Sequence, residues 1–393
     1  MNGTIYMPVG EVCSSISDTY REKKNMVTLI NTSDVLEGRV LNHERVPNSN
    51  LKGQFKKTFQ RDDILYSEIR PQNRRFAYVD FSPIDYIAST KLMVIRAKKD
   101  VVSPKYLYYF LKNSSTVAEL QLLAETRSGT FPQITFSEVA NLTIPVPSLA
   151  VQEVIVQTMQ CLEDKITCNE QINDNLEQQA QSYFQELFVD TADPEWAIGT
   201  ISDLGTIVGG STPSKAKPEY YTESGIAWIT PKDLSINKSK FVSHGENDIT
   251  ELGLKNSSAA IMPEGTVLFS SRAPIGYIAI AAGEVTTNQG FKSVVPKPEI
   301  GTPFVYFFLK NTLPVIEGMA SGSTFKEVSG STMKNVPAVI PDAETLAKFS
   351  DFCAPIFAQQ RILEEQNQSL ATLRDNLLPK LMSGEIDVSA VQL

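Results

Sequence analysis

The chain contains one long internal repeat, and this feature limits its possible folds more than any other. Four features of the first half recur in the same order in the second half, at shifts of 194 to 203 positions: Ile64-Leu65-Tyr66-Ser67 as Val267-Leu268-Phe269-Ser270, Phe110-Leu111-Lys112-Asn113 as Phe308-Leu309-Lys310-Asn311, Thr130-Phe131 as Thr324-Phe325, and Asn141 with Pro147 as Asn335 with Pro341. Repeats that stack into solenoids have periods of about 20–50 residues, far shorter than this one. We therefore interpret the chain as two copies of one large unit whose loops differ in length.

Each copy begins with a segment that predicts a mixed α/β domain with a β-rich core. Runs rich in Val, Ile, Tyr and Phe, such as 91–96 and Val267–Ser271, alternate with turn signals such as Gly209-Gly210 and predict short strands. One helix is expected in each copy, over 104–113 and 303–311, because proline lies in its first turn, where the missing N–H costs nothing. We expect the two domains to cover residues 1–150 and 191–342.

A long helix with a heptad repeat is predicted after each domain, over 151–190 and within 343–393. Residues that step alternately by four and three form one seam in each helix: Ile155, Met159, Leu162, Ile166, Asn169, Asn173, Leu176, Ala180, Tyr183 and Leu187 in the first, and Phe349, Cys353, Ile356, Gln360, Leu363, Asn367, Leu370, Arg374, Leu377 and Leu381 in the second. Such a seam is typical of a coiled coil. Asn173 and Asn367 occupy the same seam position, where a buried Asn lowers stability but fixes the register. The alternative is an ordinary amphipathic helix packed against its own domain.

These patterns together predict an α+β fold. It consists of two mixed α/β domains with β-rich cores, joined by two long antiparallel coiled-coil helices and related by a pseudo-twofold internal repeat. The first seam runs over 33 residues, which is roughly 50 Å of helix at 1.5 Å per residue. Such helices would hold two domains apart, an arrangement that suits a reader of two separated half-sites on DNA.

The charge distribution neither requires nor excludes a nucleic-acid partner. The net charge of −9 opposes binding to phosphates, which need Lys and Arg. However, residues 1–150 carry 19 basic and 15 acidic side chains, whereas residues 151–190 carry one basic and eight acidic side chains. The acidic excess therefore lies mainly in the first predicted helix.

The sequence contains no recognisable catalytic or metal-binding constellation. The two histidines, His43 and His244, are isolated, and the four cysteines include no Cys-X-X-Cys pair, so we predict no metal site and expect reduced, cytoplasmic thiols. The nearest approach to the (Asp/Asn)-Pro-Pro-aromatic motif of amino-methyltransferases is Asp193-Pro194-Glu195-Trp196, which lacks the second proline. No Gly-rich turn has nucleotide-binding spacing, and no run of 18 apolar residues or signal-peptide pattern occurs. We therefore expect a protein without catalytic activity, cofactor or membrane span.

Residues 52–75 have the composition of a DNA-contacting segment. Arginine reads guanine and Gln or Asn reads adenine in the major groove, while basic side chains also anchor phosphates. The candidate contacts in this segment are Lys56, Lys57, Arg70, Gln72, Arg74 and Arg75. We expect the arginines to lie on a loop after a strand at Ile64–Ser67. The alternative is a solvated turn.

The second copy offers a comparable set of polar side chains. Arg272 follows the strand at Val267–Ser271, and further candidates downstream are Asn288, Gln289 and Lys292. Two Gly/Ser/Thr loops at equivalent positions, 127–130 and 321–324, could bring backbone amides to phosphates, and they add Arg127, Thr130 and Thr324. The loop pattern alone is weak, since most such loops are only turns.

Several motifs resemble those of the specificity subunits of type I restriction-modification systems. The segment Trp228-Ile229-Thr230-Pro231-Lys232-Asp233-Leu234, preceded by Gly209-Gly210-Ser211-Thr212-Pro213-Ser214, resembles the opening of a target-recognition domain, and residues 31–38 resemble a variant of it. Residues 184–190 and 367–384 resemble parts of the two spacer helices of that family. The resemblance covers essentially the whole chain and adds Thr212, Lys215 and Lys232 to the candidate DNA contacts. The first copy departs most, with Cys13-Ser14-Ser15-Ile16-Ser17 in place of the Gly-Gly-Ser-Thr-Pro opening.

The resemblance implies a DNA sequence-recognition subunit that binds a bipartite double-stranded target, with one half-site in each domain. It also implies two methyltransferase subunits, which modify adenine, and motor-nuclease subunits for cleavage. S-adenosylmethionine, ATP and Mg would belong to those partners and not to this chain. The alternatives are a coiled-coil scaffold without DNA contact and a stand-alone nuclease or methyltransferase.

Overall fold

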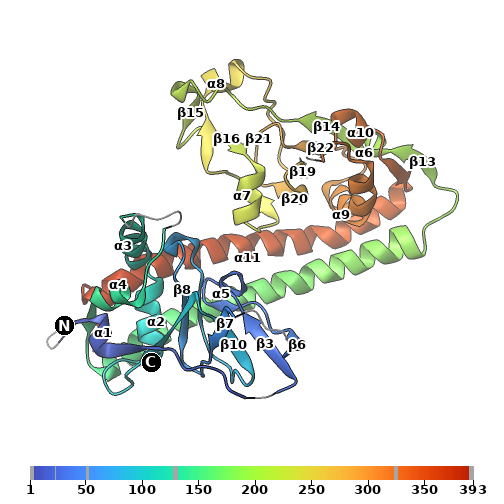
Figure 1. Ribbon diagram of the computed structural model, residues 1–393. Helices are drawn as coiled ribbons and strands as arrows, with labels where there is room; N and C mark the ends of the chain where they lie inside the picture. The colour runs from blue at the N-terminus through green and yellow to red at the C-terminus, as the bar shows by residue number, and fades with distance from the viewer. Residues whose placement is uncertain (1–3, 23, 50–52, 127–131, 323–325, 389–393) are drawn as a thin grey trace. The chain divides into compact units, whose positions relative to one another are not determined.

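The computed structural model describes residues 4–22, 24–49, 53–126, 132–322 and 326–388 and is shown in Figure 1. The chain divides into two compact units, one formed by residues 1–166 with 369–393 and the other by residues 167–368. Each unit contains one copy of the repeat and part of each of two long helices.

The first unit is built from small sheets that pack on helices. The sheets have the strand orders β1-β12, β2-β11-β8-β9, β6-β3-β10-β7 and β4-β5. The strands are β1 Ile5–Pro8, β2 Cys13–Ile16, β3 Met26–Ile30, β4 Val35–Leu36, β5 Arg39–Val40, β6 Arg45–Pro47, β7 Phe55–Lys57, β8 Ile64–Ser67, β9 Phe76–Tyr78, β10 Tyr86–Ser89, β11 Leu92–Ala97 and β12 Thr143–Val146. The helices are α1 Val9–Val12, η1 Thr32–Asp34, η2 Pro71–Asn73, α2 Pro104–Lys112, α3 Ser114–Glu125 and α4 Phe136–Asn141. One apolar core joins Tyr66 of β8, Tyr106 of α2 and Leu381 of the last helix.

The second unit has a related set of sheets. Their strand orders are β13-β23, β14-β22-β19-β20-β17 and β15-β18-β16-β21. The strands are β13 Ala197–Thr200, β14 Gly205–Gly209, β15 Tyr221–Thr222, β16 Ile226–Ile229, β17 Phe241–Val242, β18 Asn247–Ile249, β19 Val267–Ser271, β20 Ile275–Ala281, β21 Thr286–Thr287, β22 Lys292–Pro296 and β23 Pro337–Ile340. The helices are α6 Ile201–Leu204, η4 Pro218–Tyr220, α7 Pro231–Ile236, α8 Glu251–Lys255, α9 Thr302–Met319 and α10 Gly330–Lys334. Phe184, Phe304 and Phe349, from three different helices, meet in its largest core.

The strand pairings of the two units correspond residue by residue. Ile64 pairs with Ile95 in the first unit, and Val267 pairs with Val294 in the second. Likewise, Leu65 pairs with Ala77, and Leu268 pairs with Ala279. The ribbon β1-β12 of the first unit recurs as β13-β23 in the second. The predicted internal repeat and the mixed α/β character of both copies are therefore confirmed.

The predicted elements are close to those observed, with one clear difference. The helix predicted over 104–113 is α2, Pro104–Lys112, whereas the one predicted over 303–311 is α9, which continues to Met319. In the first copy the Asn113 side chain accepts a hydrogen bond from the backbone N–H of Ser115 and so starts the separate helix α3. In the second copy the helix goes on, and Ile316 is fully buried beyond the predicted end. Tertiary packing therefore decided where this helix ends.

Two long helices carry the predicted seams. They are α5, Leu149–Gln185, which continues into one π-helical turn (η3, Glu186–Asp190), and α11, Ala343–Ser383. None of the twenty predicted seam residues is exposed. In the first unit the start of α5, with Ile155 and Met159, packs with the end of α11, with Leu378 and Leu381. In the second unit the end of α5 packs with the start of α11, so within each unit the two helices run antiparallel and the seam prediction is confirmed.

The polar interruption of the seam involves more residues than the two Asn side chains predicted from the sequence. The Asn169 amide donates a hydrogen bond to the Asn367 Oδ1 atom at 2.8 Å. The backbone carbonyl of Asn173 accepts from the Gln360 amide at 3.2 Å, and its buried Oδ1 atom has no hydrogen-bond partner among the described residues. The role of Asn173 and Asn367 in fixing the register therefore stays a prediction. Asn169 and Gln360 take part in the same polar contacts between the helices.

Acidic side chains of α5 form ion pairs with a lysine that occurs at the equivalent position in each copy. Lys112 pairs with Glu163 of α5, whose carboxylate also accepts from the Tyr109 hydroxyl at 2.8 Å. The equivalent lysine of the second copy, Lys310, pairs with Glu177 of α5 at 2.5 Å. Burial lowers the pKa of Lys112, although the Glu163 carboxylate opposes the shift. The repeated Lys in the Phe-Leu-Lys-Asn motif was thus the sequence signal for a polar contact that fastens each domain to α5.

Candidate nucleic-acid interface

A glycine-rich loop of the second unit lies tightly against a neighbouring turn. Strand β14 ends at Gly209, and the backbone of Gly210 then passes so close to residues 287–288 that a Cβ atom on Gly210 would overlap their carbonyl oxygens. The backbone N–H of Ser211 donates to the Thr287 carbonyl at 2.9 Å. Only glycine permits this close approach.

Two aromatic side chains also donate hydrogen bonds to the backbone of this loop. The indole N–H of Trp228 donates to the Ser211 carbonyl at 3.0 Å, and the Tyr221 hydroxyl donates to the Pro213 carbonyl at 2.6 Å. The two rings meet edge to face, with centroids 5.7 Å apart. These contacts fix the backbone on both sides of Thr212.

The Trp-Ile-Thr-Pro-Lys-Asp motif forms the end of β16 and the capped start of α7. The Asp233 carboxylate accepts from the backbone N–H of Thr230 at 2.7 Å and from that of Glu246 at 2.9 Å. The first of these bonds is part of a capping box at the start of α7, and the second ties residue 246 to the same turn. This arrangement leaves the Lys232 side chain exposed, in an ion pair of 2.5 Å with Glu246.

A third segment, residues 288–290, completes the site. The backbone N–H of Asn288 donates to the Ile229 carbonyl at 3.0 Å, and the Asn288 side chain accepts from the N–H of Gly290 at 2.8 Å. The exposed Gln289 side chain accepts a hydrogen bond from the Thr212 hydroxyl. The turn is therefore fixed by its backbone while Gln289 faces outward.

These three segments surround one open hollow with a volume of about 720 Å³. Its lining consists of Thr212, Lys215, Tyr221, Trp228, Thr230, Pro231, Lys232, Asp233, Glu246, Asn247, Arg272, Ala273, Asn288, Gln289 and Gly290. Six of the predicted contacts of the second copy therefore come together: Thr212, Lys215, Lys232, Arg272, Asn288 and Gln289. Sequence reasoning missed the carboxylate of Glu246 and the amide of Asn247.

Of the remaining two predicted contacts of this copy, the structure describes only Lys292. The Lys292 ammonium lies outside the hollow and donates to the backbone carbonyls of Gln289 at 3.4 Å and Phe291 at 3.3 Å. Burial lowers the pKa of Lys292. Thr324 lies outside the described residues.

The hollow combines cationic and amide groups without catalytic ones. Lys215 is exposed and forms no ion pair with any residue that the structure describes, whereas Arg272 pairs with Glu327 at 3.5 Å. Exposed ion pairs contribute about 0–1 kcal/mol, so a phosphate can replace their carboxylates at little cost. Amide side chains such as those of Asn288 and Gln289 can both donate to and accept from base edges. The arrangement suits phosphate anchoring together with base readout.

In the first unit the predicted arginine loop exists, but its side chains have different roles. Arg70 and Arg74 flank the turn η2 in left-handed conformations with φ of 45° and 51°. The Arg74 guanidinium donates to the Ser114 hydroxyl at 2.7 Å, and that of Arg75 donates to the Ser33 carbonyl at 3.0 Å. Arg74 and Arg75 thus cross-link the loop to this unit, whereas Arg70 and Gln72 have exposed side chains.

The two lysines of β7 also differ from each other. The Lys57 ammonium is half-buried and donates to the carbonyls of Thr90 at 3.1 Å and Leu92 at 2.7 Å. Burial lowers its pKa. Lys57 is thus engaged by the protein's own backbone, whereas Lys56 is exposed. Arg127 and Thr130 lie outside the described residues.

The first unit has a counterpart of the capped turn in the hollow. Asp34 of η1 accepts from the backbone N–H of Asn31 at 2.7 Å, as Asp233 does from Thr230. Both turns follow a strand, β3 or β16, that pairs in parallel with a neighbour. Residues 31–38 are therefore the equivalent of the Trp-Ile-Thr-Pro-Lys-Asp region, as the family resemblance indicated.

Two kinds of feature are missing from the part of the chain that the structure describes. No group of three or more His, Cys, Asp or Glu side chains is arranged to hold a metal ion there. None of the helices in the described ranges is long and apolar enough to cross a lipid bilayer.

Comparisons with known proteins agree on one family. A family model described as "Type I restriction modification DNA specificity domain" matches residues 6–178 and 194–373. The "Type I restriction enzyme HindI specificity subunit" of Haemophilus influenzae is 29% identical over 435 residues, covering 92% of this chain and 94% of that protein. The "Type I restriction enzyme MjaIX specificity subunit" of Methanocaldococcus jannaschii is 38% identical over 194 residues, covering 47% of this chain and 45% of that protein. The crystal structure of a type I restriction-modification system S subunit from M. genitalium has a similar fold, with a TM-score of 0.55, 17% identity and coverage of 98% of this chain and 97% of that one.

The close approach at Gly210 generates a stability prediction with a neighbouring control. Gly210→Ala should destabilise the second unit by about 1–3 kcal/mol, because the added methyl group overlaps fixed backbone carbonyls. Gly209→Ala should have little effect, because a Cβ atom there meets only the Lys292 side chain at 3.9 Å. Both tryptophans of the chain, Trp196 and Trp228, lie in this unit, so tryptophan fluorescence during urea unfolding reports on it alone. Equal midpoints for the two variants would contradict the role of Gly210.

Proposed function

The chain belongs to the type I restriction-modification DNA specificity family, and on that premise we propose that each copy of its repeat reads one half of a bipartite DNA target. In this proposal the chain recognises sequence, and partner subunits carry out adenine methylation and cleavage. The domains at 1–150 and 191–342 are the two readers, and the helices at 151–190 and 343–393 join them. S-adenosylmethionine, ATP and Mg act in the partners.

The observation that carries the proposal is the convergence of three separate segments on the hollow of the second unit. Residues 209–214, 228–234 and 288–290 are far apart in the sequence, yet they meet at one hollow. Its lining includes three cationic and three amide side chains: Lys215, Lys232, Arg272, Asn247, Asn288 and Gln289. Their backbones are held by hydrogen bonds, so the polar side chains are oriented before DNA arrives. A preorganised site loses less entropy on binding than a flexible one does.

The proposed partners follow from the same repeat. A bipartite target methylated on both halves requires a methyltransferase at each half-site, and two equivalent copies of one unit give two equivalent places for it. We therefore propose two methyltransferase subunits per chain, joined by motor-nuclease subunits for cleavage, in a complex located in the cytoplasm with its double-stranded DNA target.

The first test of this proposal exchanges one reader. Residues 200–342 would be replaced by the corresponding region of a relative that has a different target, and methylated positions would be mapped in cells that also contain the methyltransferase partner. Only one half of the methylated motif should change, because the other reader is untouched. If both halves change together, the two copies do not read independently.

The second test separates the two kinds of contact in the hollow. Lys215→Ala should weaken all DNA sequences alike and lower the salt slope of binding by about one unit, because it removes a phosphate contact. Gln289→Ala should cost about 1–3 kcal/mol on the cognate half-site and relax one base position, because it removes a base contact. Affinity of the assembled methyltransferase complex would be measured on cognate and single-base-altered duplexes at several salt concentrations.

A control variant for this test lies two residues from Lys215. Lys217 is also exposed, pairs with Glu219 at 3.6 Å and is not part of the hollow, so Lys217→Ala should bind as the unaltered chain does. Should Lys215→Ala and Gln289→Ala also behave like the unaltered chain, the hollow does not contact DNA, and a scaffold role becomes the better explanation.

A further inference from the structure

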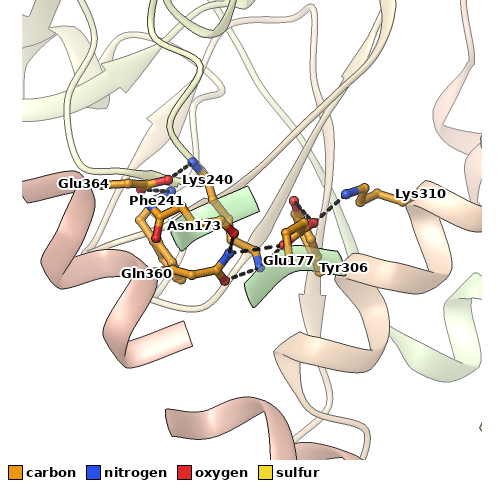
Figure 2. A network of polar contacts seen from close by, with 8 residues as sticks. All are labelled: Asn173, Glu177, Lys240, Phe241, Tyr306, Lys310, Gln360 and Glu364. Carbon is orange, nitrogen blue, oxygen red and sulfur yellow. Dashed lines mark hydrogen bonds and ion pairs between the residues drawn. The ribbon is translucent and has the colours of Figure 1, made fainter. Parts of the chain in front are cut away.

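A buried polar cluster attaches the second domain to both long helices (Figure 2). At its centre is Lys240, which lies in the loop between α7 and β17 and has a side chain that is 6% exposed. Its ammonium donates to Glu177 of α5 at 2.7 Å and to Gln360 of α11 at 2.8 Å. The same ammonium lies 3.7 Å from the centroid of the Phe357 ring. One side chain thus contacts α5 and α11 at once.

The backbone of Lys240 is held as firmly as its side chain. The two carboxylate oxygens of Glu364 accept from the backbone N–H groups of Lys240 at 2.7 Å and Phe241 at 3.0 Å. The Lys240 carbonyl accepts from the N–H of Ile280 at 2.7 Å. Because buried charges and polar groups are stable only when paired, this cluster defines one geometry between the loop and the helices.

The counter-ion of Lys240 is shared. Glu177 also pairs with Lys310 at 2.5 Å, and the Tyr306 hydroxyl donates to it at 3.2 Å. Burial lowers the pKa of Lys240 to about 8, with Glu177 opposing the shift. If the Lys240 charge is removed, Glu177 stays paired with Lys310, so the Glu177 carboxylate is still neutralised.

The cluster contacts the long helices far from the two points where the domain is joined to them covalently. The domain is joined covalently to α5 near residue 190 and to α11 near residue 343. Gln360 and Glu364 lie 17 and 21 residues beyond the start of α11, which corresponds to about 26–32 Å of helix. Without a contact so far from the covalent joints, the domain would be held mainly at one end. Arg361, which donates to the Ala282 carbonyl at 2.9 Å, is nearby but 39% exposed, so its contribution is smaller.

The first copy has no lysine at the position equivalent to Lys240. Strand pairing identifies the equivalent of Lys240 in the first copy as Gly38, since the Gly38 carbonyl accepts from Tyr78 as the Lys240 carbonyl accepts from Ile280. The space that a side chain would need at Gly38 is taken by the Tyr108 hydroxyl. The lysine is thus not required by the common fold.

Lys240 is also close in sequence to the hollow. It follows Lys232 by eight residues, and α7 connects the two. Whatever fixes the loop at Lys240 therefore also fixes the direction in which α7 and the hollow face.

We propose that Lys240 is a positioning residue that fixes the orientation of the second reader on the helix pair and thereby the spacer length accepted between the two half-sites. This inference rests on the proposed function. It assigns to Lys240 no contact with DNA, only the placement of the side chains that make such contacts.

The test measures spacing preference, which a merely structural residue would not change. The full chain, assembled with its methyltransferase partner, would methylate duplexes that carry the mapped target with its natural spacer, or with a spacer one base pair shorter or longer. One base-pair step displaces a half-site by about 3.4 Å. Lys240→Met, which keeps the length and apolar stem of the side chain, should lower the preference for the natural spacer by about tenfold, the factor that a loss of about 1.4 kcal/mol in discrimination produces. The base preference within each half-site should not change.

Two further substitutions make the test decisive. Lys238→Met is the control, because Lys238 is exposed in the same loop and lies over the Tyr277 ring, 4.9 Å from its centroid, and not on the helices. Glu364→Gln weakens the same contact from α11, since an amide cannot accept from both backbone N–H groups through its two side-chain atoms. Glu365→Gln is its control, because Glu365 is exposed and loses an ion pair of 3.2 Å with Arg361, whose own hydrogen bond to the Ala282 carbonyl remains. Glu364→Gln should broaden the spacing preference in the same direction, and it decides the question alone if Lys240→Met does not fold.

The outcomes separate this inference from the function on which it rests. If the unaltered chain directs methylation to no bipartite target, the proposed function is wrong. If it does so, and Lys240→Met and Glu364→Gln keep the spacing preference of their controls, Lys240 does not position the second reader. Loss of base preference at the natural spacing would also overturn the inference, because it would make Lys240 part of the reading surface itself.

Discussion

The structure depends on the antiparallel packing of α5 against α11. Neither helix buries its apolar seam alone, and an isolated helix in water gains most of its stability from such packing and little from the propensity of its residues. In each unit the apolar side chains of the seam extend into the core of the adjoining domain, as Ala180 and Phe349 do with Phe304. The helix pair therefore belongs to the core of both units and is more than a linker between them.

The duplication of the repeat explains why the two units share a framework and differ at their surfaces. The pairings of β8 with β11 and of β19 with β22 agree in register, and the repeated lysines Lys112 and Lys310 both bind carboxylates of α5. The loops that the framework carries have diverged. The second unit uses Gly210 and Trp228 to shape a hollow, whereas the first uses Arg74 and Arg75 to fasten a turn. A common framework with different loops is what two readers of different half-sites require.

The sequence predicted those features that repeat at short range. The heptad seam, the strand Val267–Ser271 and the strand before the arginine loop were all correct, because side-chain periodicity and turn residues act locally. Six side chains of the hollow were also named from the sequence. Arg272, Asn288 and Gln289 followed from their residue types, and the family resemblance added Thr212, Lys215 and Lys232. Whether a given Arg or Lys faces outward was not predictable: Arg74 and Lys57 bind carbonyl oxygens that are 38 and 33 residues away in the sequence. The cluster around Lys240 was missed for the same reason, because its members come from α5, the loop that leads into β17, α9 and α11, which are far apart in the sequence.

The central claim is that one duplicated chain reads two separate half-sites. It is tested most directly by mapping methylated adenines across the genome of cells that express this chain together with its methyltransferase partner. We expect a single motif with two specified blocks separated by a fixed number of unspecified base pairs, and methylation in both blocks. A continuous motif, or methylation without sequence preference, would contradict the account.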